Sequence, residues 1–172
     1  MKKIILSTLL VVAVSAFCTL TAQNKSNRPS PPAQLEGMID GLKVTVDYSR
    51  PSVKERKIFG GLEPYGKVWR TGANETTWIE FSEDVKINGE ALAKGKYGLF
   101  TIPNEDQWTI IFNKDWKGWG AYKYNQSNDV LRIEVEANNA NSHTEQFTIG
   151  IDESGEMSLA WDKTLVNFTV SR

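Results

Sequence analysis

The sequence has very little cysteine and histidine. Cys18 is the only cysteine of the 172 residues, and His143 is the only histidine. A zinc site needs several thiolate or imidazole ligands, and the carboxylates of this chain show no ligand-like spacing. We therefore expect no metal and no cofactor, with calcium in an Asp- and Asn-bearing turn such as residues 104–106 as the alternative. A serine triad is not predicted, because no G-x-S-x-G elbow occurs and His143 would have to be the base.

Long apolar runs are also absent, except at the N-terminus. Lys2 and Lys3 precede an apolar run over residues 4–17, which is shorter than a bilayer span and ends in small residues. This pattern is typical of a secretory signal peptide, predicted over residues 1–23. Cleavage is expected near residues 22–23, and residues 16–18 offer an alternative site. The chain is thus predicted to be exported to the periplasm or the extracellular space.

Cys18 falls within this leader, which decides two further points. A lipoprotein signal would make Cys18 the acylated first residue, but Phe17 stands where a small residue is normally required. Lipidation is therefore not expected. Removal of Cys18 leaves a mature chain without thiols, so disulfides and cysteine catalysis are excluded. No transmembrane segment is expected after cleavage.

A global positive charge is missing as well. The formal net charge is −1, and it becomes −3 without Lys2 and Lys3, so the composition does not favour a nucleic-acid partner. The charge is uneven along the chain. Residues 50–75 carry six basic and three acidic side chains, whereas residues 129–162 carry eight acidic side chains and one arginine. An anionic partner is expected on the basic side.

Helical periodicity is absent, and alternation of apolar and polar residues is frequent. Residues 24–33 (NKSNRPSPPA) hold three prolines and are predicted to be a flexible linker, which leaves one domain over residues 34–172. Asp40-Gly41 predicts a type I′ hairpin turn between strands at 35–39 and 42–48. Further strands are expected at 76–82, 85–88, 96–102, 107–113, 129–136, 145–151, 157–161 and 164–170, with turns at 153–155 and 162–163. This predicts an all-β fold, a mostly antiparallel β-sandwich of about eight to ten short strands.

Two segments interrupt the strand pattern, and irregular segments of this length commonly bind ligands. In the first, residues 50–75, the RTGANE sequence offers the Arg70 guanidinium to an anion, with Asn74 and Glu75 as hydrogen-bonding partners. Gly72 would allow a ligand close to the backbone. The alternative is structural: Arg70 and Glu75 pair across a turn that Asn74 caps.

The second irregular segment is the aromatic loop (residues 114–128), whose rings could stack on sugars while its lysines accept an acidic group. The alternative is that these rings cover the open end of the sandwich. Trp78, which faces outward from its predicted strand, also needs cover or a ligand. The ligand-binding candidates from both segments are Arg50, Lys57, Trp69, Arg70, Asn74, Glu75, Lys114, Trp116, Trp119 and Tyr122.

Several blocks of the chain resemble a known family. They are DYSRPSVKERKIFGGLEPYGKVWRTGANETT, INGEALAKGKYGLFTIP, WTIIFNKDWKGWGAY and DVLRIEV. Together they are similar to the domain of unknown function numbered 2911, found in secreted and cell-envelope bacterial proteins, over roughly residues 34–172. The resemblance implies export and a β-rich domain, and it implies no catalytic residue.

Three functions follow as hypotheses. The first is a non-catalytic envelope domain that binds a carbohydrate or other anionic small molecule. The second is a hydrolase or lyase that uses Glu75 with Arg70, which would require both groups in one pocket and a shifted Glu75 pKa. The third is a protein-interaction module of the envelope, which requires an exposed apolar patch.

Overall fold

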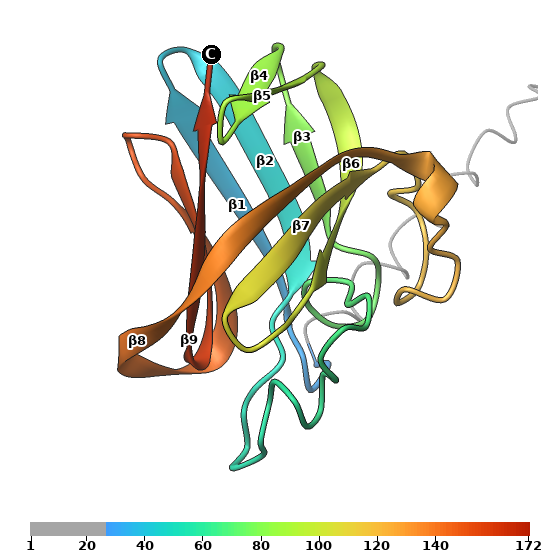
Figure 1. Ribbon diagram of the computed structural model, residues 1–172, viewed down its shortest axis with the longest axis vertical. Helices are drawn as coiled ribbons and strands as arrows, with labels where there is room; N and C mark the ends of the chain where they lie inside the picture. Colours follow the sequence, from blue (N-terminus) through green and yellow to red (C-terminus); the bar gives the residue numbers. More distant parts are fainter. Residues whose placement is uncertain (1–26) are drawn as a thin grey trace, which may run out of the picture.

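A computed structural model describes residues 27–172, so the predicted signal peptide lies outside the described residues (Figure 1). In this range the only helical element is the short 3-10 turn η1 (Gln126–Asn128). No helix of residues 27–172 is long and apolar enough to span a membrane. The strands are β1 (Pro32–Ile39), β2 (Leu42–Ser49), β3 (Trp78–Phe81), β4 (Val85–Ile87), β5 (Glu90–Leu92), β6 (Gly95–Ile102), β7 (Gln107–Asn113), β8 (Asp129–Ile151) and β9 (Glu156–Ser171).

The all-β prediction is confirmed. The nine strands form one sheet in the order β1-β2-β3-β6-β7-β8-β9-β4-β5, and every neighbouring pair is antiparallel. The pairing therefore joins all strands in one sheet and does not divide them between two. Strand β8 makes this continuity, because its first part pairs with β7 and its second part with β9. In Figure 1, β8 runs diagonally alongside β7 before it meets β9.

The segment after β2 also forms backbone hydrogen bonds with the second part of β8. Just beyond β2, Ser52 forms an antiparallel bridge with Gln146 of β8. The Val53 N–H donates to the Glu145 carbonyl at 2.8 Å, and the Phe147 N–H donates to the Pro51 carbonyl at 2.9 Å. The sheet is thus folded over, with a single core inside.

The last third of the chain has fewer and longer strands than the sequence predicts. Four short strands were expected, but β8 has 23 residues and β9 has 16. The predicted turn at residues 162–163 is wrong: Asp162 lies within β9 with φ 54°, opposite register shifts in β8. Backbone pairing needs no apolar side chains, so strand β8 continues through the mostly polar residues 138–143. The predicted turn at 153–155 does separate the two strands.

The first hairpin agrees with its sequence signature. Asp40 and Gly41 both have positive φ, 47° and 85°, as a type I′ turn requires, and they join β1 to β2 in register. β1 begins at Pro32, inside the segment predicted to be a linker. Residues 28–31 of that segment also contact the domain, as described below.

Buried aromatic rings fill the centre of the core. Trp69 stacks on Trp161 with 5.6 Å between ring centroids and an interplanar angle of 16°. Three further rings contact Trp69, Trp161 or both edge-on: Phe59, Trp108 and Phe147. The centroid distances of the edge-on pairs within this cluster are 4.6–6.1 Å. All five side chains are at most 8% exposed. Buried rings of this size are a large part of the hydrophobic stabilisation of a domain.

Candidate functional site

The RTGANE segment is held to the domain by buried groups at both of its ends. Trp69 anchors one end in the core, and its indole N–H donates to the Gly72 carbonyl at 3.0 Å. At the other end the Thr77 hydroxyl donates to the Thr71 carbonyl at 2.8 Å. A Cβ on Gly72 would lie 2.9 Å from the Ser49 carbonyl oxygen. Gly72 therefore admits the backbone of β2, and not a ligand as the sequence suggested.

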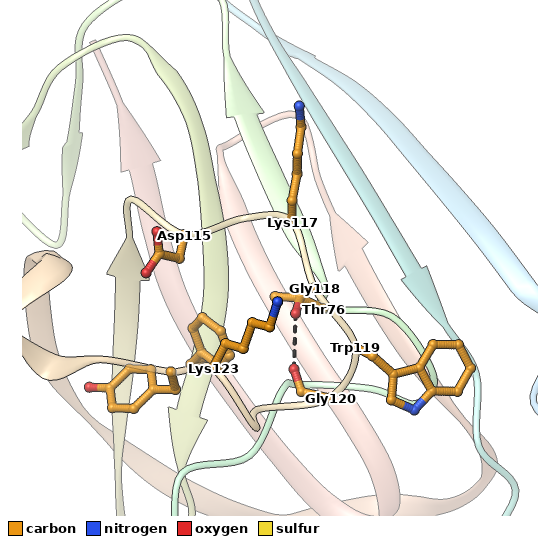
Figure 2. Close-up of a pocket in the computed structure, with 9 residues that line it drawn as sticks. Thr76, Asp115, Lys117, Gly118, Trp119, Gly120 and Lys123 are labelled. Carbon is orange, nitrogen blue, oxygen red and sulfur yellow. Dashed lines mark hydrogen bonds between the residues drawn. The ribbon is translucent and has the colours of Figure 1, made fainter.

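The aromatic loop is hydrogen-bonded to this segment. The Gly120 N–H donates to the Asn74 carbonyl at 2.8 Å. The Thr76 hydroxyl donates to the Gly120 carbonyl at 2.9 Å, the dashed bond in Figure 2. Glu75 and Trp119 form an antiparallel bridge. The two irregular segments are thus brought together in one rigid surface.

The N-terminal residues complete this surface. Arg28 Nη1 donates to both carboxylate oxygens of Glu75, at 2.9 Å and 2.7 Å. The Arg28 guanidinium also lies over the Trp119 ring, 5.7 Å from its centroid. The Asn74 side-chain amide donates to the Ser30 carbonyl at 3.0 Å. The expected pairing of Glu75 with Arg70 is replaced by pairing with Arg28, which the sequence reasoning had placed in the linker.

Two aromatic side chains of the loop face solvent. Trp119 is 54% exposed and Tyr122 is 87% exposed, and Lys117 and Lys123 are exposed beside them. A hollow at the base of the loop is lined by Thr76, Phe100, Asp115, Lys117, Gly118, Trp119, Gly120, Lys123 and Tyr124 (Figure 2). Its water-accessible volume is about 10 Å³, room for about one water molecule. A larger ligand would lie on the surface of the loop.

Comparison with known proteins identifies the family to which the chain belongs. A family model described as "Protein of unknown function (DUF2911)" matches residues 30–170. The chain belongs to the DUF2911 family. The match spans β1 to β8 and all but the last residue of β9, and it begins two residues after Arg28. No curated protein and no solved structure matches. The roles of residues in this DUF2911 protein therefore rest on geometry.

Trp116 of the DUF2911 domain is covered by two lysines, both closer to its ring centroid than Arg28 is to that of Trp119. The Lys96 ammonium lies 3.7 Å from the Trp78 ring centroid and 4.8 Å from that of Trp116, and Lys117 lies 4.6 Å from the latter. Lys96 also pairs with Glu80 at 3.2 Å. The outward-facing Trp78 is therefore covered by a lysine, and the faces of these two rings are already occupied.

The remaining candidates are Trp69, Arg50, Lys57 and Lys114, the last of which begins the aromatic loop. Trp69 is 2% exposed in the core, so its ring is not offered to a ligand. Arg50, the residue after β2, is bonded to β8: its Nε donates to the Phe147 carbonyl at 3.1 Å, and its Nη2 donates to the Thr148 hydroxyl at 2.8 Å. Lys57 and Lys114 are exposed.

The charge of Arg70 acts on a carboxyl group, Glu63, that was not among the predicted site residues. The pKa of Glu63 is raised to about 7, because burial raises it by more than the nearby positive charges of Arg70 and Arg56 lower it. Within residues 27–172, the buried Nε of Arg70 donates no hydrogen bond. The charge of Arg70 thus acts on the Glu63 carboxyl. In the sequence, Glu63 is a single acidic residue between Leu62 and Pro64. This position alone does not indicate that its carboxyl group is buried.

The raised pKa of Glu63 predicts a pH-dependent stability. Between pH 4.5 and about pH 7, Glu63 is protonated in the native state and ionised in the unfolded state. The contribution of Glu63 to the free energy of unfolding is therefore fully present below pH 4.5 and is lost as the pH rises through about 7. Glu63→Gln is expected to raise the free energy of unfolding at about pH 8 and to change it little at about pH 4.5. Urea unfolding at both values tests this, with the exposed Glu105→Gln as control. An equal effect of Glu63→Gln at both pH values would contradict it.

Proposed function

We propose that this DUF2911 protein is an exported, non-catalytic domain that binds an acidic carbohydrate on its aromatic loop. The observation that carries the proposal is the exposure of Trp119 and Tyr122, 54% and 87%, on a loop whose backbone is fixed. Water-exposed aromatic faces stack well on sugar rings, and a loop that is already ordered loses little entropy on binding. Export rests on the leader pattern of residues 1–23.

The charge of the loop supports an acidic ligand. Residues 114–124 carry three lysines and one acidic residue, Asp115. The Asp115 carboxylate accepts a hydrogen bond from the Asn128 amide at 2.7 Å, which keeps it engaged within the loop. Lys117 and Lys123 lie exposed on either side of Trp119 in sequence. A sugar that carries a carboxylate or sulfate would therefore meet aromatic and cationic groups together.

The other two hypotheses receive less support. An acid or base role for Glu75 with Arg70 is disfavoured because both Glu75 carboxylate oxygens accept from Arg28 Nη1, while the charge of Arg70 acts on Glu63. A protein-interaction surface would need a continuous apolar patch. The exposed large aliphatic side chains of residues 27–172 come from three separate elements: Met38, Leu62 and Val130.

Trp119→Ala tests the binding site. The loss of one central aromatic contact is expected to weaken binding of galacturonate oligosaccharides about tenfold or more, measured by isothermal titration calorimetry. Met38→Ala is the control, since Met38 is 59% exposed on β1 and its loss should leave affinity unchanged. Equal affinity of wild type and Trp119→Ala would refute the site. Failure of the wild type to bind acidic or neutral oligosaccharides would refute the function.

A further inference from the structure

Arg28 has a position that the ion pair alone does not explain. Its guanidinium contacts the carboxylate of Glu75 and at the same time lies over the exposed ring of Trp119. The Arg28 side chain is 27% exposed, so part of the guanidinium over this ring reaches solvent. A cation beside the ring is where an acidic sugar stacked on Trp119 would place its charge.

The Arg28 guanidinium also has N–H groups that Glu75 does not use. Both contacts with Glu75 use Nη1, at 2.9 Å and 2.7 Å. To the described residues, Arg28 Nε and Nη2 donate no hydrogen bond. These two nitrogens form one edge of the guanidinium fork, which matches the two oxygens of a carboxylate or sulfate.

The backbone next to Arg28 is fixed as well. The Ser30 carbonyl accepts from the Asn74 amide at 3.0 Å, and the Pro31 carbonyl accepts from the Arg50 N–H at 2.9 Å. Beyond these bonds, β1 continues the chain into the sheet. The arginine is therefore held in place before any ligand arrives.

We infer that Arg28 determines the preference of the site for acidic sugars. A carboxylate or sulfate on a pyranose ring binds the Nε and Nη2 edge of Arg28 while the ring stacks on Trp119. Glu75 acts as the positioning residue for the guanidinium. This inference rests on the proposed function and adds the ligand's anionic group and the residue that recognises it.

The experiment compares three oligosaccharides that share the galactose ring configuration: galacturonate, sulfated galactose and neutral galactose oligomers. Binding of each is measured by calorimetry at low and high salt. The wild type is expected to bind the acidic forms about tenfold to a hundredfold more tightly than the neutral form. Arg28→Ala is expected to abolish this preference while keeping the neutral affinity. Arg28→Lys keeps the charge without the fork, so it should retain only a small, salt-sensitive preference.

The control removes a comparable surface arginine at the other end of β1. Arg172 pairs with Glu83 and donates to the Asp40 carbonyl at the β1–β2 turn, so Arg172→Ala should keep the wild-type preference. Equal binding of acidic and neutral sugars by the wild type, or an undiminished preference in Arg28→Ala or Arg28→Lys, would overturn the inference and leave Trp119 binding intact. Absence of all binding would instead remove the proposed function. A preference for one acidic form identifies the anion as carboxylate or sulfate.

Discussion

Trp69→Ala is expected to lower the free energy of unfolding by about 3–5 kcal/mol, the range for truncation of a buried aromatic ring. Trp69 is 2% exposed, stacks on Trp161 and meets Phe59 and Phe147 edge-on. The substitution leaves a cavity at the centre of this cluster. It also removes the indole donor that holds the Gly72 carbonyl at 3.0 Å. Guanidinium unfolding of wild type and variant measures the loss.

The contrast with Trp119 makes this prediction specific. Trp119 is 54% exposed, so Trp119→Ala should change the free energy of unfolding by less than about 0.5 kcal/mol, as ordinary surface substitutions do. One tryptophan variant is thus expected to lose stability and the other to lose binding. Wild-type stability of Trp69→Ala would contradict the core position of this ring.

Gly155→Ala is expected to destabilise the domain by about 2–5 kcal/mol, combining a left-handed backbone with overpacking. Gly155 has φ 85° in the turn between β8 and β9, and an added Cβ would lie 2.1 Å from the Val170 carbonyl oxygen. That oxygen belongs to backbone, so β9 itself would have to move. Thermal and denaturant unfolding of the purified variant measure the effect.

Gly89 provides the matched control for this substitution. Its φ is 89°, nearly that of Gly155, but an added Cβ would meet no atom within 4 Å. Gly89→Ala should therefore show only the conformational cost, about 1–2 kcal/mol. The difference between the two variants isolates the steric clash with β9. Equal losses in both variants would show that the close approach is relieved at no cost.

The fold class could be predicted because local patterns decide it. Asp40-Gly41 allows few conformations besides a tight turn, and the alternation through Ile79 and Phe81 assigns one face of β3 to the core, where both are at most 2% exposed. The length of β8 and β9 was not predictable in this way. The polar residues between their apolar stretches look like loop sequence, and only pairing with the opposite strand extends them.

The candidate site was predicted in part, for a different reason. Asn74, Glu75 and Trp119 were selected from two separate segments, and the structure does bring them together. Their partner Arg28 was assigned to the linker, because a proline-rich stretch carries no periodicity that reveals docking. Trp69 was selected for its irregular surroundings. Its burial depends on rings from distant strands, which no local pattern contains.

The closure of the sheet has a consequence for biosynthesis. The seam from Ser52 to Gln146 joins the first third of the chain to the last, and the core also needs Val166 and Phe168 of β9. Contacts between such distant positions cannot form until both have been made, and loops of this length close slowly. The core can therefore close only when residues near 52 and residues 146–168 are present together, so the domain is expected to fold late and largely in a single event.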